Sequence, residues 1–178
     1  MSELHTRCLD VFPDWLRTLP KDATELSAIL ESDAPASTKR YAAGALNYLF
    51  KSLDLIPDGI EDLGFLDDAF VLRVAARQAA TEQGADAPAI IGHLAEGAGL
   101  IEELLGADYA RLSKYVTGLR SGAARGRTVD EIVDDATVRG AFMGELTAWA
   151  SGYQPPSFTR DDKTLVKLTS FLSAKLPA

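Results

Sequence analysis

Residues 54–69 read DLIPDGIEDLGFLDDA and join two stretches of helical pattern. Before them, apolar and small residues recur at three- and four-residue spacing, which predicts a helix over about residues 38–53. Pro57 cannot continue a helix, and it disfavours helical geometry at Ile56. After the connection, Asp67 and Asp68 precede a strongly apolar helical stretch, where acidic residues suit the N-terminal end of the helix dipole. The segment therefore predicts two buried helices joined by a tight turn, an αα-hairpin.

The rest of the chain repeats the helical spacing, and no convincing run of alternating residues predicts a strand. Helix-start patterns open at Asp22, Thr128 and Thr159, because each is followed three residues later by an acidic residue. Pro155 and Pro156 separate the last predicted helix from the one before it. We therefore predict an all-α protein, a compact bundle of about seven or eight helices around the central αα-hairpin.

A candidate linker divides the chain. Residues 121–127 read SGAARGR, and this Gly- and Ala-rich stretch lacks the apolar spacing of its neighbours. We predict a helical core over residues 1–120, which contains the hairpin. Residues 121–178 should form C-terminal helices packed on the same domain.

The amino-acid composition of the chain argues against some classes of function. The chain has 178 residues, is 47% hydrophobic and carries a formal net charge of -8. A globular fold is expected, and nucleic-acid binding is not, because phosphate binding depends on Lys and Arg. Cys8 is the only cysteine, so neither an intrachain disulfide nor a zinc site built from thiolates is available. Without a signal-peptide pattern or an apolar stretch of about 18 residues, we expect a cytoplasmic protein with no transmembrane segment.

The hairpin motif has a family resemblance. The sequence DLIPD at residues 54–58, followed by LGFLDDA at residues 63–69, resembles the signature of the YkvA-type bacterial domain of unknown function. Residues 43–49 also resemble that domain's first helix, so the resemblance covers about residues 40–76. The chain departs from the family at residues 51–53 and at Glu61, where the family usually has prolines. The resemblance implies a helical hairpin and no established activity. A composition rich in Ala, Gly and Arg is compatible with a bacterial source.

The aspartates of the hairpin suggest three interpretations. The candidate metal ligands are Asp54, Asp58, Asp67 and Asp68. No basic residue lies between Lys51 and Arg73, and carboxylate oxygens are the ligands that Mg²⁺, Mn²⁺ and Ca²⁺ prefer. The same carboxylates could instead cap helix ends, or they could form an acidic docking surface together with Glu61 and Asp62. The sequence leaves these three alternatives open.

A second candidate surface lies near the C-terminal end. Tyr153 and Phe158 flank two prolines in a predicted loop, and aromatic side chains are common anchors at interfaces. No complete catalytic constellation can be assembled, so we expect a non-enzymatic protein-interaction module with an unidentified protein partner and no cofactor. One alternative is a divalent-metal-binding protein or metal-dependent hydrolase that uses the four aspartates. The other is a peripheral membrane-associated protein. The oligomeric state is not predicted.

Overall fold

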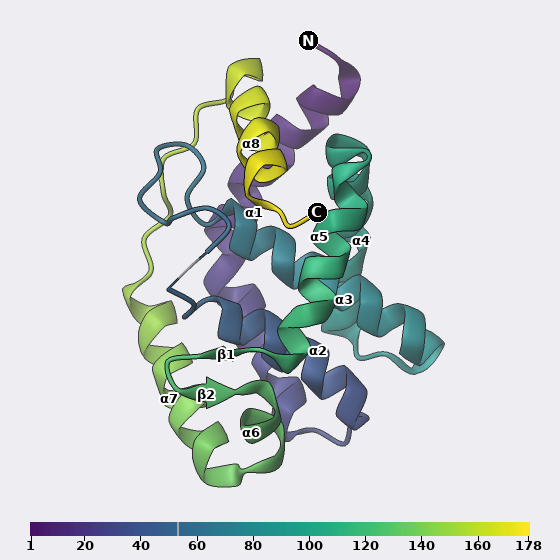
Figure 1. Cartoon of the computed structure of the whole chain (residues 1–178), viewed down its shortest axis with the longest axis vertical. Helices are drawn as coiled ribbons and strands as arrows, with labels where there is room; N and C mark the ends of the chain where they lie inside the picture. The colour runs from purple at the N-terminus through teal and green to yellow at the C-terminus, as the bar shows by residue number, and fades with distance from the viewer. Residues whose placement is uncertain (53) are drawn as a thin grey trace.

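The computed structural model describes residues 1–52 and 54–178, and this part of the chain is all-α except for one short β-hairpin (Figure 1). The α-helices are α1 (Glu3–Ser27), α2 (Ala36–Tyr48), α3 (Leu66–Gln83), α4 (Ala89–Leu105), α5 (Asp108–Gly118), α6 (Val129–Asp134), α7 (Ala136–Gly152) and α8 (Asp162–Lys175). Single turns of 3-10 helix, η1 (Ala28–Glu31), η2 (Gly84–Asp86) and η3 (Leu119–Ser121), follow α1, α3 and α5. The β-hairpin consists of β1 (Ala123–Ala124) and β2 (Arg127–Thr128). The predicted all-α bundle is confirmed.

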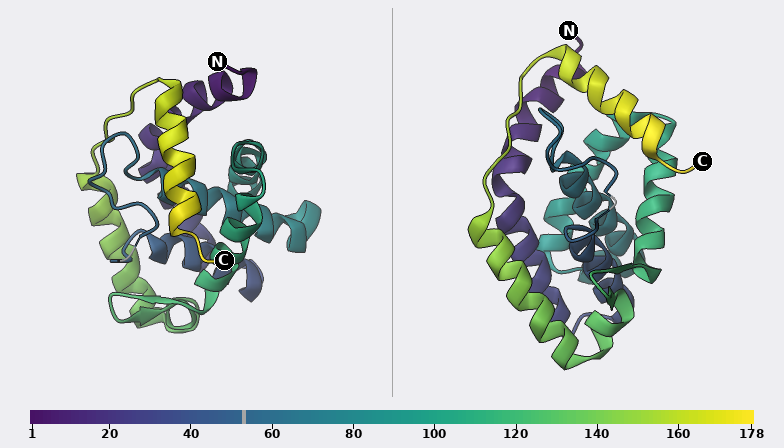
Figure 2. Two further views of the ribbon diagram at one scale, coloured as in Figure 1. Left: turned by 45° about the horizontal axis from the view of Figure 1, so that its top comes forward. Right: turned by 60° about the vertical axis from the view of Figure 1, so that its left-hand side comes forward.

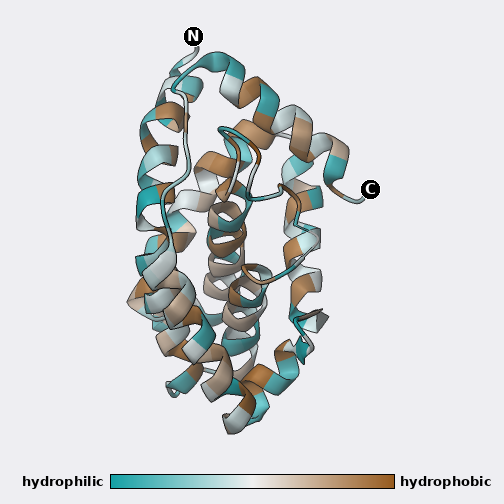
Figure 3. Ribbon diagram, turned by 90° about the vertical axis from the view of Figure 1, so that its left-hand side faces the viewer, coloured by the Kyte–Doolittle hydropathy of each residue, from teal (hydrophilic) through white to brown (hydrophobic). Residues whose placement is uncertain are grey.

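Helix α3 lies at the centre of the bundle and packs mainly against α2 and α4. Residues on every side of its first three turns are buried, from Leu66 to Ala76, as expected of a helix surrounded by protein. Helices α1 and α7 flank this centre on one side and α5 on the other (Figure 2). In Figure 3 the helix that begins at the N-terminus carries brown and teal residues in turn, because only one of its faces is buried.

The predicted helix over residues 38–53 is shorter than expected. Helix α2 ends at Tyr48, and turn hydrogen bonds then continue to Lys51, whose N–H donates to the carbonyl of Tyr48 at 3.0 Å. Leu53, the predicted last residue of this helix, lies outside the described residues. The αα-hairpin itself forms, because α2 and α3 pack side by side and the connection joins their ends.

The helix start predicted at Asp22 is wrong. Asp22 lies inside α1, which runs on past Pro13 and Pro20 as far as Ser27. Its carboxylate is buried, where it accepts from the Thr18 hydroxyl at 3.0 Å and pairs with Arg73 of α3 at 3.2 Å. Arg73 also stacks on the ring of Trp15, with 4.0 Å between the guanidinium carbon and the ring centre. A long-range ion pair therefore explains this aspartate, and a capping box does not.

The predicted linker contains β1 and the first residue of β2, and the sequence analysis predicted neither strand. Strands β1 and β2 are antiparallel, with Ala123 opposite Thr128 and Ala124 opposite Arg127. Thr128 then caps α6 in a full capping box with Glu131, so this predicted helix start is confirmed. Helix α6 packs on α2 and helix α7 on α1. The domain division at residues 120 and 121 stays a prediction.

The C-terminal segment crosses the hairpin connection. Residues 153–161 run without helix from α7 to α8, along the side of the molecule that carries α1 (Figure 2). Helix α8 begins after Asp161, whose carboxylate accepts from the N–H of Lys163, so the helix start lies two residues beyond the predicted Thr159. No helix among the described residues has the length and apolar character needed to cross a membrane.

Candidate functional site

The connection between α2 and α3 is folded tightly on itself. The N–H of Ile60 donates to the carbonyl of Pro57 at 3.0 Å, and the N–H of Gly64 donates to that of Ile60 at 2.9 Å. A Cβ atom at Gly64 would lie 2.1 Å from the carbonyl oxygen of Asp58, so only glycine fits there. Pro57 and Gly64 thus fix the turn that the sequence predicted, and the aspartates are placed around it.

Tyr48 and Asp67 hold the two ends of the connection together. The Tyr48 hydroxyl donates to Oδ2 of Asp67 at 2.5 Å and accepts from the N–H of Leu55 at 2.7 Å. The N–H of Ile56 donates to the same Asp67 oxygen at 3.2 Å. Asp67 therefore stabilises the backbone of the connection from inside the first turn of α3, where Phe65 is the residue at the cap position. Tyr48 was not among the predicted site residues.

The four candidate aspartates lie together at this connection, and few hydrogen-bond donors or positive charges balance their carboxylates. Asp67 and Asp68 are buried, with 1% and 2% of their surface exposed. One carboxylate oxygen each of Asp54, Asp67 and Asp68 is buried without a hydrogen-bond donor among the described residues. None of the four forms a salt bridge within this part of the chain. Buried carboxylates without donors or counter-charges strongly favour protonation.

Burial and mutual repulsion raise the pKa values of these carboxyl groups. Desolvation, then the charges of Asp67 and Asp58, raise the pKa of Asp54 to about 7. Burial raises the pKa of Asp58, and it raises those of Asp67 and Asp68 as well. Burial, and after it the charge of Asp67, raises the pKa of Asp68 well above its usual value.

The positions of the acidic side chains bear on whether they bind a metal ion. Among residues 1–52 and 54–178, no three His, Cys, Asp or Glu side chains are placed to hold a metal ion together. A divalent cation would therefore require side-chain rotation in the group formed by Asp54, Asp58, Asp67 and Asp68. The metal ligands stay a prediction.

The two predicted interaction segments lie against each other. Asp62, which has a positive φ of 66°, accepts from the N–H and the hydroxyl of Thr159 at 2.9 and 3.0 Å. Lys167 of α8 donates to the carbonyl oxygen of Glu61 at 3.1 Å. Thr159 of segment 153–161 and Lys167 of α8 thus contact the connection at Asp62 and Glu61.

Tyr153 and Phe158 are both half-buried. The Tyr153 hydroxyl donates to the carbonyl of Leu16 at 2.6 Å, and its ring packs edge-on against Phe65 with 5.2 Å between ring centres. The Phe158 side chain packs against the core. A partner role for these aromatic side chains, and for Glu61 and Asp62, stays a prediction.

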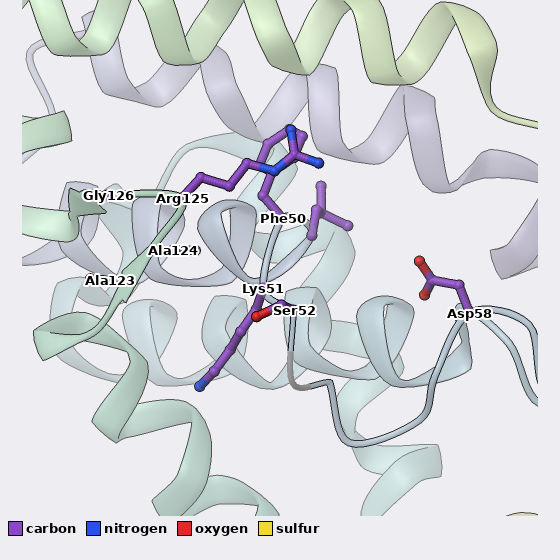
Figure 4. A pocket seen from close by; sticks show the side chains of 9 residues that line it. Phe50, Lys51, Ser52, Asp58, Ala123, Ala124, Arg125 and Gly126 are labelled. Carbon is purple, nitrogen blue, oxygen red and sulfur yellow. The ribbon is translucent and has the colours of Figure 1, made fainter.

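An open cleft of about 590 Å³ lies between the connection and the β-hairpin. One wall comes from the end of α2 and the connection, and the other from the tip of the β-hairpin. The lining residues are Leu49, Phe50, Lys51, Ser52, Asp58, Ala123, Ala124, Arg125 and Gly126. Figure 4 shows Arg125 and Phe50 on one side of the cleft and Asp58 on another, with the Lys51 side chain extending away from both.

Arg125 has an uncommon backbone conformation at the edge of this cleft. Arg125 and Gly126 form the two-residue loop of the β-hairpin, and their φ angles are 51° and 76°. Two positive φ angles are typical of a type I′ turn, in which Asn or Gly is strongly preferred at the first position. The guanidinium of Arg125 lies 5.0 Å from the centre of the Phe50 ring. Sequence analysis missed both residues, because Arg-Gly is not one of the dipeptides, such as Asn-Gly or Asp-Gly, that mark a two-residue hairpin loop.

Comparison with known proteins gave a match for the αα-hairpin segment alone. No curated protein and no solved structure matches the chain. Residues 38–73 match a family model described as "Protein of unknown function (DUF1232)". The matched segment includes α2, the connection with its four aspartates, and α3 as far as the buried Arg73. The predicted resemblance over residues 40–76 is thereby confirmed, and the αα-hairpin of this chain is a segment similar to that family of unknown function.

Proposed function

We propose that the chain is a non-enzymatic helical module that binds a protein partner in the cleft between the hairpin connection and the β-hairpin. The proposal places the partner against the segment that matches the family model, because Leu49–Ser52 and Asp58 line one wall. Ligand sites are typically concave, mostly apolar surfaces with a few convergent polar groups. Here Leu49, Phe50 and two alanines supply the apolar lining, and Lys51, Arg125 and Asp58 supply the charges.

The main support for this proposal is the left-handed backbone conformation of Arg125. A left-handed conformation costs a non-glycine residue about 1–2 kcal/mol, and strained residues of this kind cluster at functional sites. Gly at this position would form the same turn without that cost. Arg125 presents its guanidinium over Phe50 at the cleft. Among the described residues, neither Arg125 nor Lys51 forms a salt bridge, and Lys51 makes one long hydrogen bond, 3.4 Å, to the Tyr115 hydroxyl, so both cations can meet an anionic group of a partner.

Selection from a random peptide library displayed on phage tests this function directly. The whole chain would be the bait, and each enriched peptide would be synthesised and its affinity measured by fluorescence anisotropy. Arg125→Gly removes the guanidinium and also relieves the backbone strain, so the variant should fold at least as stably as the parent. Lys163→Gln, on the exposed start of α8, is the matched control for loss of one positive charge.

We expect enriched peptides whose affinity falls about tenfold or more in Arg125→Gly and changes little in Lys163→Gln, because a charged hydrogen bond contributes about 1.5–3 kcal/mol. Peptides that bind Arg125→Gly as tightly as the parent chain would contradict the proposal. So would a selection that enriches no specific peptide at all.

A second candidate function has one observation in its favour. The three carboxylate oxygens without donors would be satisfied by a hard divalent cation as well as by protons. Stabilisation by Mg²⁺, Mn²⁺ or Ca²⁺ that is lost in Asp58→Asn would support this alternative. It places the ion at the connection, where Asp58 also lines the proposed partner cleft.

A further inference from the structure

The cleft continues into a longer groove. Next to it lies a narrow hollow of about 20 Å³, and beyond that a cavity of about 320 Å³. Lys51 lines all three spaces. Ala123 and Ala124 line both the cleft and the narrow hollow, and Leu119 and Gly122 line both the hollow and the far cavity. The three spaces are therefore neighbours along one groove, which runs from the tip of the β-hairpin past the end of α2 to α5.

The narrow middle of the groove contains a buried acceptor without a donor. Asn47 is 3% exposed, and its side-chain nitrogen donates to the carbonyl of Arg127 at 3.3 Å. This bond fixes the orientation of the amide and leaves its oxygen Oδ1 buried with no donor among the described residues. Because Asn47 lines the narrow hollow, the missing donor would come from whatever occupies it. A backbone N–H is a suitable donor for an amide oxygen at such a constriction.

The charged side chains along the groove are mainly positive, and Ala178 also lines the far cavity. Arg125 lies at one end, Lys51 in the middle, and Lys114 and Arg111 at the far end. Arg111 is already occupied, because it pairs with Asp108 at 2.7 Å and donates to the carbonyl oxygens of Leu176 and Pro177.

The other three cations form no salt bridge in the described part of the chain. Within residues 1–52 and 54–178, the one hydrogen bond that Lys51 donates from its side chain goes to the Tyr115 hydroxyl, at 3.4 Å. Asp58 is the one carboxylate side chain that lines the groove as described.

We infer that the groove binds an extended acidic peptide segment of a partner protein. Its carboxylates would meet Arg125 at one end and Lys114 at the other, and a backbone N–H between them would donate to Oδ1 of Asn47. A helix is about 10 Å across, so the narrower extended backbone with a small side chain is the better match to a hollow of only about 20 Å³. The expected pattern is therefore acidic residues on both sides of a Gly or Ala. This inference rests on the proposed function, and it names the class of partner.

Synthetic peptides test the inference on the whole chain. The probe is a fluorescein-labelled 11-residue peptide in which three Asp residues precede and three follow a central glycine, with Ser at the remaining positions. Comparison peptides replace every Asp with Asn, or the central Gly with Leu. The protein variants are Lys114→Gln at an exposed position and Lys163→Gln as the control with equal charge loss. Anisotropy would be measured at two salt concentrations.

We expect the acidic peptide to bind, and the Asn peptide and the Leu peptide to bind at least tenfold more weakly. Lys114→Gln should weaken the acidic peptide about fivefold, and Lys163→Gln should leave its affinity unchanged. N-methylation of successive peptide bonds removes one N–H at a time without altering the protein. One position near the centre should lose about tenfold in affinity, because the oxygen of Asn47 again lacks its donor.

Equal weakening by Lys114→Gln and Lys163→Gln would show general attraction to charge and would overturn the inference. So would an N-methyl series with no sensitive position, or preference for the Asn peptide. These failures are distinguishable from failure of the proposed function. The library could instead yield neutral or basic peptides whose binding still depends on Arg125. The cleft then binds a partner, but the inference that this partner supplies an extended acidic segment is wrong.

Discussion

Replacing Asp54 with asparagine should stabilise the protein at pH 8 and have little effect near pH 4. Burial and the charges of Asp67 and Asp58 raise the pKa of Asp54 from 3.8 to about 7 in the folded protein. Between pH 4 and pH 7 the folded state therefore holds a proton that the unfolded state releases. In that window the unfolding free energy falls as the pH rises, because the unfolded state binds fewer protons. Below pH 4 the group is protonated in both states and contributes nothing to this dependence.

The size of the effect follows from the raised pKa. A change from 3.8 to about 7 corresponds to an upper limit of about 4 kcal/mol for ionising Asp54 in the folded protein. Asp54 is half-buried, so solvent screening reduces the expected contribution to about 1–2 kcal/mol. Asp54→Asn keeps the shape of the side chain and cannot ionise. At pH 8 it should raise the midpoint of thermal unfolding by about 2–8 °C, given about 2–4 °C per kcal/mol for a domain of this size.

The assay is thermal and urea unfolding of the parent chain and Asp54→Asn at pH 4, 5, 6, 7 and 8, with constant ionic strength. Asp33→Asn serves as the control, because Asp33 is exposed in the turn before α2. The difference between Asp54→Asn and the parent should grow from pH 4 to pH 8, and that of Asp33→Asn should not. A pH-independent difference, or a variant that is less stable at pH 8, would refute the reasoning about the buried carboxylates.

Three further predictions concern the core and the connection. Gly97→Ala should lower the unfolding free energy in urea by about 1–2 kcal/mol, because its Cβ would lie 2.7 Å from Cδ of Arg73 and 2.9 Å from Cζ2 of Trp15. Asp22→Asn should cost about 3–5 kcal/mol in the same assay, since it leaves the buried Arg73 charge without its partner. If the aspartates bind a divalent cation, Mg²⁺, Mn²⁺ or Ca²⁺ at about 100 times its dissociation constant should raise the thermal midpoint by about 5–10 °C relative to chelator. Asp58→Asn should abolish that rise, and a chain that responds equally to all three ions or to none would argue against the site.

Local patterns in the sequence predicted the helices well where local contacts decide the structure. The spacing of apolar residues predicted the αα-hairpin, and the pattern at Thr128 predicted the start of α6. The same kind of pattern failed at Asp22, because its carboxylate pairs with Arg73, 51 positions further along the chain. The β-hairpin was missed because its two-residue strands are too short to show alternation, and its turn has Arg125 where Asn or Gly is usual.

The site was predicted only in the part that is local in sequence. The four aspartates fall within 15 positions, so a closed turn necessarily brings them together, and their gathering was expected. The groove is formed by residues from Asn47 and Lys51 to Lys114 and Arg125, which are far apart along the chain. No pattern in the sequence indicates that these residues lie close together in the fold. Packing of the β-hairpin and η3 against α2 creates that surface, and only the fold shows it.

The most direct test of the proposed binding groove is a map of amide chemical shifts during titration of the ¹⁵N-labelled chain with the acidic peptide. The account predicts that the largest changes fall on residues 122–127, on Lys51 and on the side-chain amide of Asn47, with smaller changes near Lys114. Arg125→Gly should remove most of these changes without altering the spectrum of α3. Changes centred on α4 or α8, or no changes at peptide concentrations that saturate the anisotropy signal, would contradict the assignment of the groove as the partner site.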